Sequence, residues 1–327
     1  MGSNANTAYL RRRITLGVIV AALAAVALAV ASGSSHSASR PSGAAAGHGS
    51  TVPGTTTTVT PAGPPPPALL VKTAAHPGSG WQVVAYVHGQ PAAWESQRGG
   101  VTLLRFDQSG LRLDLHAGSS DGGVGGWKYG DQISASEIHH VVAAFNGGFK
   151  FSYREVGFVS GGHVGAPLSA GLGSIVTYTN GTTNVGAWGA GVPSSRLTVY
   201  SVLQNERLLV DRGRVAANAS SCVIECWGAT INGVTSVARS GLGITATGQL
   251  VWAAGESLLP AQLGAALVSA GAVRAVELDI NPFWVAGYLY LHRPNGPLPV
   301  PLVPGQVGIE GKLLTPDSRD FMTIVAR

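Results

Sequence analysis

Two acids and an amide alternate along residues 276–281, and their types and spacing suit acid–base chemistry. In a strand, Glu277, Asp279 and Asn281 would share one face, while apolar residues occupy the other. Acidic side chains are costly to bury unless they are paired. We therefore expect active-site acids at the C-terminal end of an inner strand, with Arg239 pairing either with them or with an anionic substrate. The alternative is a solvated strand face.

A second candidate is the apolar run at residues 141–150, which ends in Asn-Gly-Gly-Phe-Lys. Asn146 would supply an amide to a ligand, and Gly147 and Gly148 would let that ligand approach the backbone. Lys150 would add a positive charge for an anionic group. The alternative, from local signals alone, is a hairpin turn.

Other motifs exclude several kinds of site. A Gly-x-Ser-x-Gly motif at residues 118–122 would need a helix directly after it to serve as a nucleophile elbow. Glycines follow instead, so we expect a loop, at most at the rim of a site. Neither of the glycine-rich phosphate-binding motifs occurs, so we expect no nucleotide cofactor. On a helix, the side chains of the adjacent His139 and His140 would point about 100° apart, which makes them a poor pair of metal ligands. We therefore predict no metal site, and we also predict no cofactor.

Four segments of this chain follow one another in an order that resembles the phosphodiester glycosidase family, the domains like N-acetylglucosamine-1-phosphodiester alpha-N-acetylglucosaminidase. They are AAFNGGFK (143–150), VLQNERLLVDRGRV (202–215), ARSGLGITATGQLVWAAG (238–255) and LGAALVSAGAVRAVELDIN (263–281). The pattern is similar to that of exported, actinobacterial-type relatives. Members typically have Asn-Gly-Gly-Phe, an Arg before a glycine-containing strand, and Leu-Asp-Gly-Gly-Gly-Ser. In this chain residues 280–283 replace the last three glycines and the serine.

The resemblance implies hydrolysis of a sugar-1-phosphodiester at its glycosidic bond. It places Asp279 and Glu277 as the catalytic acids and Arg239, with Lys150, as the phosphate-binding cations. The substrate would be an envelope glycan or a sugar phosphate. The replaced glycines support an alternative, a non-catalytic glycan-binding or envelope scaffold protein on the same fold.

The elements that must position these residues are mostly strands. Alternating patterns predict strands at residues 81–87, 101–107, 111–117, 173–179, 197–203, 242–247, 249–254 and 272–280. Helices are expected at residues 134–142, where Ser134 and Glu137 would form a capping box, and at residues 260–270, between a proline and a glycine. We expect an α+β fold: one strand-rich domain, residues 69–327, with a few helices packed on a mixed sheet.

The N-terminal part of the chain predicts export. Residues 14–31 are apolar and uncharged, and three arginines precede them directly. By the positive-inside rule this is a single-pass membrane anchor, with residues 1–13 in the cytoplasm and the domain outside. The alternative is a cleaved signal peptide and a secreted domain. Residues 32–68 are rich in Ser, Thr, Gly, Ala and Pro and would form a disordered stalk.

Charge and cysteine content narrow the function further. The 327 residues hold 21 basic and 16 acidic groups, but four of the arginines lie in residues 1–68, which contain no acid. The remaining 17 basic and 16 acidic groups nearly cancel, so a nucleic-acid partner is excluded. The two cysteines, Cys222 and Cys226, would form a disulfide in an exported protein, and free thiols are the alternative.

Overall fold

The computed structural model describes residues 68–76, 78, 80–122, 126–153, 156–306 and 313–327. The predicted cytoplasmic segment, the predicted membrane anchor and the predicted stalk up to residue 67 lie outside these described residues. Within the described part of the chain, no helix has both the length and the apolar character needed to cross a membrane.

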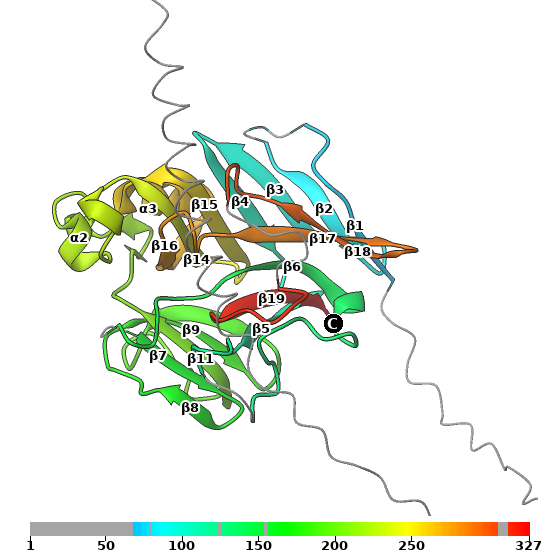
Figure 1. Cartoon of the computed structure of the whole chain (residues 1–327), viewed down its shortest axis with the longest axis horizontal. Coiled ribbons are helices and arrows are strands. Elements are labelled where there is room, and N and C mark those ends of the chain that lie inside the picture. The colour runs from blue at the N-terminus through cyan, green and yellow to red at the C-terminus, as the bar shows by residue number, and fades with distance from the viewer. Residues whose placement is uncertain (1–67, 77, 79, 123–125, 154–155, 307–312) are drawn as a thin grey trace, which may run out of the picture. The chain divides into compact units, whose positions relative to one another are not determined.

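The described residues are 47% strand and 9% helix, and the strands form three antiparallel sheets (Figure 1). The predicted α+β class, with helices on a mixed sheet, is therefore wrong, and the domain is mostly β. Short turns join most successive strands, and two strands joined by a short turn can only pair antiparallel. The helix Pro260–Ser269 does not alter this pattern, because the strand that follows it, Ala272–Ile280, pairs antiparallel with the strand Val237–Thr245.

The largest sheet has nine strands. In spatial order they are β1 (Leu69–Val71), β2 (Gln82–Val87), β3 (Gln90–Arg98), β4 (Val101–Phe106), β15 (Leu250–Leu258), β14 (Val237–Thr245), β16 (Ala272–Ile280), β12 (Val210–Asp211) and β13 (Arg214–Val215). The strand predicted at residues 272–280 is confirmed as β16, and it is an inner strand of this sheet.

Two five-stranded sheets complete the domain. One has the order β10 (Thr183–Ala187), β9 (Gly173–Tyr178), β11 (Val199–Asn205), β7 (Val156–Ser160) and β8 (His163–Ala166). The other has the order β18 (Gly296–Pro301), β17 (Gly287–Arg293), β6 (Val141–Asn146), β19 (Phe321–Ala326) and β5 (Leu111–His116). Because β6 and β7 belong to different sheets, the Asn-Gly-Gly segment between them is not a hairpin turn.

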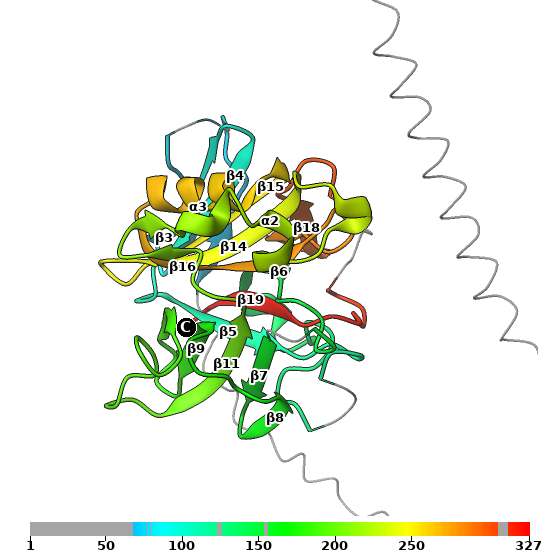
Figure 2. The same cartoon turned by 90° about the vertical axis from the view of Figure 1, so that its left-hand side faces the viewer.

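One of the two predicted helices is confirmed. The helix α3 (Pro260–Ser269) begins at its proline and ends before Gly271, whose φ of 95° suits glycine. Its buried Leu263 and Leu267 pack on the outer face of β14, β15 and β16 (Figure 2). Shorter helical turns are η1 (Ile138–His140), η2 (Ala217–Ala219), α2 (Val223–Cys226) and η3 (Ile231–Gly233).

The helix predicted at residues 134–142 is wrong. The expected cap forms, since the Ser134 hydroxyl accepts from the Glu137 backbone N–H at 3.2 Å. However, the chain makes only the 3₁₀ turn η1 and then enters β6 at Val141. Val141 and Val142 are fully buried, and both are β-branched, which favours a strand paired on both sides over a short helix.

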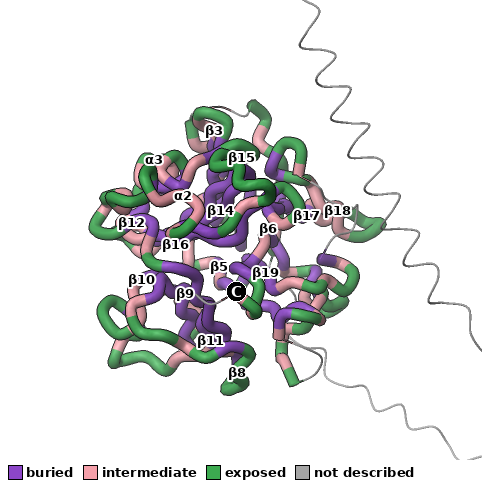
Figure 3. The backbone as a smooth tube through the Cα atoms, turned by 60° about the vertical axis from the view of Figure 1, so that its left-hand side comes forward, coloured by how far each residue is buried: buried purple, intermediate pink, exposed green. Residues whose placement is uncertain are grey.

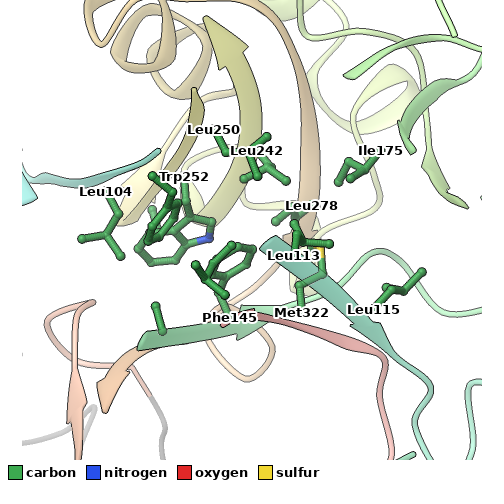
Figure 4. Close-up of a cluster of buried hydrophobic side chains, with 14 of the residues drawn as sticks. Leu104, Leu113, Leu115, Phe145, Ile175, Leu242, Leu250, Trp252, Leu278 and Met322 are labelled. Carbon is green, nitrogen blue, oxygen red and sulfur yellow. The ribbon is translucent and has the colours of Figure 1, made fainter. Parts of the chain in front are cut away.

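The main core lies between the nine-stranded sheet and the sheet that contains β6. Trp252 and Phe145 stack with ring centroids 5.5 Å apart, next to Leu104, Leu278 and Met322 (Figure 4). The inner strands of all three sheets are buried over most of their length (Figure 3). This packing brings the C-terminal ends of β6 and β16 together, which is where the sequence placed its candidate residues.

The predicted disulfide is confirmed: Cys222 and Cys226 are bonded across α2. The next residue, Trp227, is almost fully buried, and its carbonyl oxygen accepts from Arg239 at 3.1 Å. The disulfide thus closes a small loop beside a core tryptophan.

Candidate active site

The ends of β6 and β16 are joined by direct hydrogen bonds. The Asp279 backbone N–H donates to the carbonyl of Gly147 at 3.1 Å. The Asn146 side-chain amide donates to the Ser240 hydroxyl at 2.9 Å, and that hydroxyl lies 3.2 Å from the Asp279 carbonyl oxygen. The structure therefore brings together the Asn-Gly-Gly segment, the strand of Arg239 and the predicted acid segment.

Glu277 and Arg239 form a buried ion pair. The Arg239 Nη1 lies 2.7 Å from Glu277 Oε1, and both side chains are fully buried. The guanidinium also donates to three backbone carbonyls, those of Trp227, Thr235 and Leu258. Burial raises the pKa of Glu277 to about 7, and Arg239 opposes that rise. Neither side chain lines the pocket described below, so the structure places both behind the candidate site.

Asp279 faces a pocket and is paired with an arginine that the sequence analysis missed. Its Oδ2 lies 3.0 Å from Arg319 Nη2, and its Oδ1 accepts from the backbone N–H of Ile280 at 2.8 Å. The side chain is 8% exposed. Burial raises the pKa of Asp279 to about 7, while the charge of Arg319 opposes the rise.

Arg319 connects three parts of the site. Besides Asp279, its Nη2 donates to the Gly148 carbonyl at 2.7 Å, and its Nε pairs with Asp121 Oδ2. Asp121 belongs to the Gly-x-Ser-x-Gly loop, and its Oδ1 accepts from the backbone N–H of Phe151 at 3.2 Å. That loop therefore reaches the candidate site through an aspartate rather than through a serine nucleophile.

Asp320 is a second buried carboxyl at this site. Its Oδ2 accepts from the Gly148 N–H at 2.9 Å, and its Oδ1 has no hydrogen-bond partner among the described residues. Burial raises the pKa of Asp320 to about 7, against the charge of Arg319. A side chain at position 147 would overlap Asp320, which explains the glycine there.

We call the hollow above these groups the Asp279 pocket. It holds about 220 Å³, and its lining includes Phe149, Lys150, Tyr153, Asp279, Trp284 and Arg319. The Lys150 Nζ and the Arg319 Cζ lie 5.0 and 5.1 Å from the centre of the Trp284 ring. Aromatic and cationic groups thus surround a carboxyl group.

A small cavity adjoins this pocket. It holds about 20 Å³ and is lined by Asn146, Gly147, Asp279, Trp284, Arg319 and Asp320, among others. A single water needs roughly 10–15 Å³ and several polar partners. The cavity therefore has room for one water between two carboxyl groups.

Asn281 also lines the Asp279 pocket, in a conformation that few residues adopt. Its φ is 76°, a left-handed value that asparagine tolerates better than most residues. Its Oδ1 accepts from the backbone N–H of Ile231 at 3.2 Å. The side chain is thus engaged with the wall of the pocket.

Of the predicted site residues, the structure brings Asp279, Asn281 and Lys150 to the pocket, and Asn146 and Gly147 to the adjoining cavity. Gly148 contributes through its backbone: its N–H donates to Asp320, and its carbonyl oxygen accepts from Arg319. Sequence reasoning missed Arg319, Asp320 and Asp121. The only available signal was the charged pair Arg319-Asp320, directly before the apolar strand β19.

The described residues contain no group of three or more His, Cys, Asp or Glu side chains that could hold a metal ion. The carboxyl groups of Asp121 and Asp279 both face the Arg319 guanidinium instead.

No protein-family model and no curated protein matches the chain. Among solved structures, it is similar to the catalytic domain of zebrafish N-acetylglucosamine-1-phosphodiester alpha-N-acetylglucosaminidase, auto-inhibited by its pro-peptide. That match has a TM-score of 0.44 and 10% identity, and covers 80% of this chain and 88% of the other. A hypothetical protein from Synechocystis matches with a TM-score of 0.39 and 13% identity, over 73% of this chain and 63% of that one. Structural similarity at this level does not indicate the function of this chain.

Proposed function

We propose that this domain is a glycosidase-type hydrolase that acts on a sugar-1-phosphodiester, or on a related anionic envelope glycan, in the Asp279 pocket. One observation carries the proposal: Asp279 has a pKa raised to about 7 and borders both the pocket and the small cavity. A carboxyl group that keeps its proton near neutral pH can donate it to a leaving oxygen.

The walls of the pocket suit a sugar that bears a phosphate. Arg319 and the exposed Lys150 would attract the phosphate, because charge-assisted hydrogen bonds to phosphate are strong. Phe149, Tyr153 and Trp284 offer aromatic surface to the apolar faces of a sugar ring.

Glycosidases use two carboxyl groups, one as the acid and one for water or for the anomeric carbon. Glu277, the second acid expected from the sequence, lies outside the pocket. In this proposal Asp320 takes that part, because it borders the small cavity and its Oδ1 is available to accept from a water held there. The water would attack the anomeric carbon and give a proton to the ionised Asp320 carboxylate, while the bond from the anomeric carbon to the leaving oxygen breaks and Asp279 protonates that oxygen.

A second candidate function is glycan binding without catalysis. Both oxygens of Asp279 already accept hydrogen bonds, from Arg319 and from the Ile280 backbone. A carboxyl held in this way can serve as a fixed wall of a binding site. The two candidates differ in whether free sugar is released.

For location, the proposal keeps the sequence expectation. The domain would stand outside the cytoplasmic membrane, on the anchor predicted at residues 14–31, or would be secreted if that segment is cleaved. Envelope glycans and phosphodiester polymers are the substrates found there.

The deciding experiment compares the full chain in detergent with its Asp279→Asn variant, on a methyl diester of a sugar 1-phosphate. We expect the variant to release free sugar about 10²–10⁴-fold more slowly, at a nearly unchanged melting temperature. The control is Glu225→Gln, because Glu225 is exposed and lines neither this pocket nor the larger hollow at the other end of β16.

Equal turnover in Asp279→Asn and in the native chain would exclude Asp279 as the acid. If the native chain binds the diester but releases no sugar, glycan binding is the function.

A further inference from the structure

A second, larger hollow lies at the opposite end of β16 from the Asp279 pocket. It holds about 570 Å³, and its lining includes Asp211, Arg212 and Arg274. We call it the Arg212–Arg274 hollow. Its lining residues come from the ends of β10, β12, β14 and β16 and from the loops beside them. Figure 3 shows the backbone of β10, β12 and β16 in this part of the domain. Arg212 and Arg274 belong to the segments 202–215 and 263–281, but neither is among the predicted site residues.

The Arg274 guanidinium is only partly satisfied by protein groups. Its Nη2 donates to Asn184 Oδ1 at 2.9 Å. Its Nε is buried and has no hydrogen-bond partner in the described part of the chain. Because buried donors are nearly always satisfied, this donor is expected to bond either a water or a ligand atom in the hollow.

Arg212 occupies a backbone position with a left-handed φ, which other residues adopt more readily than arginine. It forms the tip of the β12–β13 hairpin with Gly213, and both residues have left-handed φ values, 50° and 71°. Two-residue turns of this kind favour Asn-Gly. The Arg212 side chain is 92% exposed, and Asp211, at 4.0 Å, is its only recorded ion-pair partner among the described residues. An exposed pair at that distance is weak, so the guanidinium is available to an anion.

The two hollows lie at the two ends of β16, so a ligand that contacts both must be a linear molecule at least as long as the strand segment between them. Arg274 and Asp279 are five residues apart on β16, or about 17 Å at ~3.4 Å per residue. We propose that the Arg212–Arg274 hollow binds a phosphodiester group of a linear polymer that has a phosphate in every repeat, while another repeat of the same polymer occupies the Asp279 pocket. This inference rests on the proposed function, since it names the substrate class of the same domain.

Joint occupancy has a physical consequence. Once one repeat is bound, the second contact is intramolecular, and its effective concentration is set by the linking chain. A polymer should therefore bind far more tightly than its single repeat, without any new kind of contact.

The test measures binding of a fluorescent glycerol-phosphate decamer to the full chain in detergent. This probe contains no sugar and hence no glycosidic bond, so its binding does not depend on turnover. Arg274→Gln should weaken binding about tenfold and Arg212→Asn about threefold, because the second group is exposed and screened. Asparagine suits the turn, so Arg212→Asn should keep the native melting temperature.

Arg214→Asn is the matched control, because it makes the same charge change on the same hairpin and Arg214 does not line the hollow. It should bind the decamer as the native chain does. Lys150→Ala, in the Asp279 pocket, should also weaken decamer binding, while a single glycerol phosphate should bind far more weakly than the decamer.

Decamer binding that is equal in Arg212→Asn, Arg214→Asn and the native chain would overturn the proposal. Unchanged binding in Lys150→Ala would overturn joint occupancy. If Arg212→Asn reduced binding to anionic phospholipid vesicles but not to the decamer, the hollow would be a lipid site and the proposal would be wrong. A chain without turnover whose Arg212→Asn variant loses decamer affinity would refute the proposed function and leave the hollow as a polyanion site.

Discussion

Three carboxyl groups in this domain have pKa values raised to about 7, and burial is the largest cause for each. They nevertheless stand in different environments. Glu277 is paired with Arg239, whereas Asp279 borders the pocket and one Asp320 oxygen has no hydrogen-bond partner in the part of the chain that the structure describes. A raised pKa therefore does not identify the acid by itself. Access to the pocket distinguishes Asp279 from Glu277.

These shifts predict that the domain is more stable at pH 5 than at pH 8. For Asp320 the folded-state pKa, about 7, exceeds the usual value of 3.8. The folded state therefore binds the proton more tightly than the unfolded state. The stability that the protonated Asp320 contributes is fully present below pH 3.8 and is lost as the pH rises through 7. Urea unfolding at both pH values checks the sign. Asp320→Asn should reduce the difference, and Asp211→Asn should not; a domain that is more stable at pH 8 would contradict the shifts.

Gly147 offers a prediction at the same scale. A Cβ at this position would overlap the Asp320 side chain, which is fixed by its hydrogen bond from Gly148. Gly147→Ala should thus lower the free energy of unfolding by about 3 kcal/mol, the upper range for overpacking. Gly130→Ala is the control, because a Cβ at that position meets nothing within 4 Å. Equal stability of the two variants would show that the Asp320 side chain yields easily.

At the scale of elements, local sequence signals predicted a helix or strand correctly where the packing and pairing around the segment favoured the same structure. The strand β16 and the helix α3 both matched expectation, since the proline and glycine at the two ends of α3 act locally. The segment before β6 did not match, because its cap was real but the pairing of β6 with β17 and β19 decided the outcome. Such pairing involves residues about 150 or more positions away, which no local pattern reveals.

The disulfide permits a prediction about its element. It closes a loop of only five residues, so chain entropy predicts a contribution of about 2 kcal/mol. In urea unfolding, the double variant Cys222→Ser, Cys226→Ser should lose that amount of unfolding free energy. The comparison is Asp279→Asn, a change at the pocket and not at the disulfide, which should leave the stability nearly unchanged. No loss of stability would mean that Trp227 and Arg239 hold this segment without the bond.

At the scale of the molecule, the candidate site is a product of sheet packing. Asp121, Asn146, Asp279 and Arg319 come from segments spread over about two hundred residues, and they meet only where the sheets pack together. Sequence patterns predicted the segments that carry their own motif, such as Asn146 and Asp279. They missed Arg319, because the charged pair Arg319-Asp320 gives no local sign of the distant carboxyl groups, those of Asp121 and Asp279, that Arg319 contacts in the fold.

The last prediction concerns the boundary of the domain. Among the described residues, those that form the buried cores all lie at or beyond Val71, and β1, the first described strand, is an edge strand that pairs only with β2 among the described strands. All 16 acidic residues also lie beyond residue 68. A chain of residues 68–327 should therefore fold alone, without detergent, because it contains every described core residue and a nearly balanced set of 17 basic and 16 acidic residues. Its melting temperature should match that of the full chain in detergent, measured by circular dichroism with the disulfide intact in both. A shortened chain that aggregates, or that melts well below a full chain that behaves well in detergent, would place the boundary earlier in the sequence.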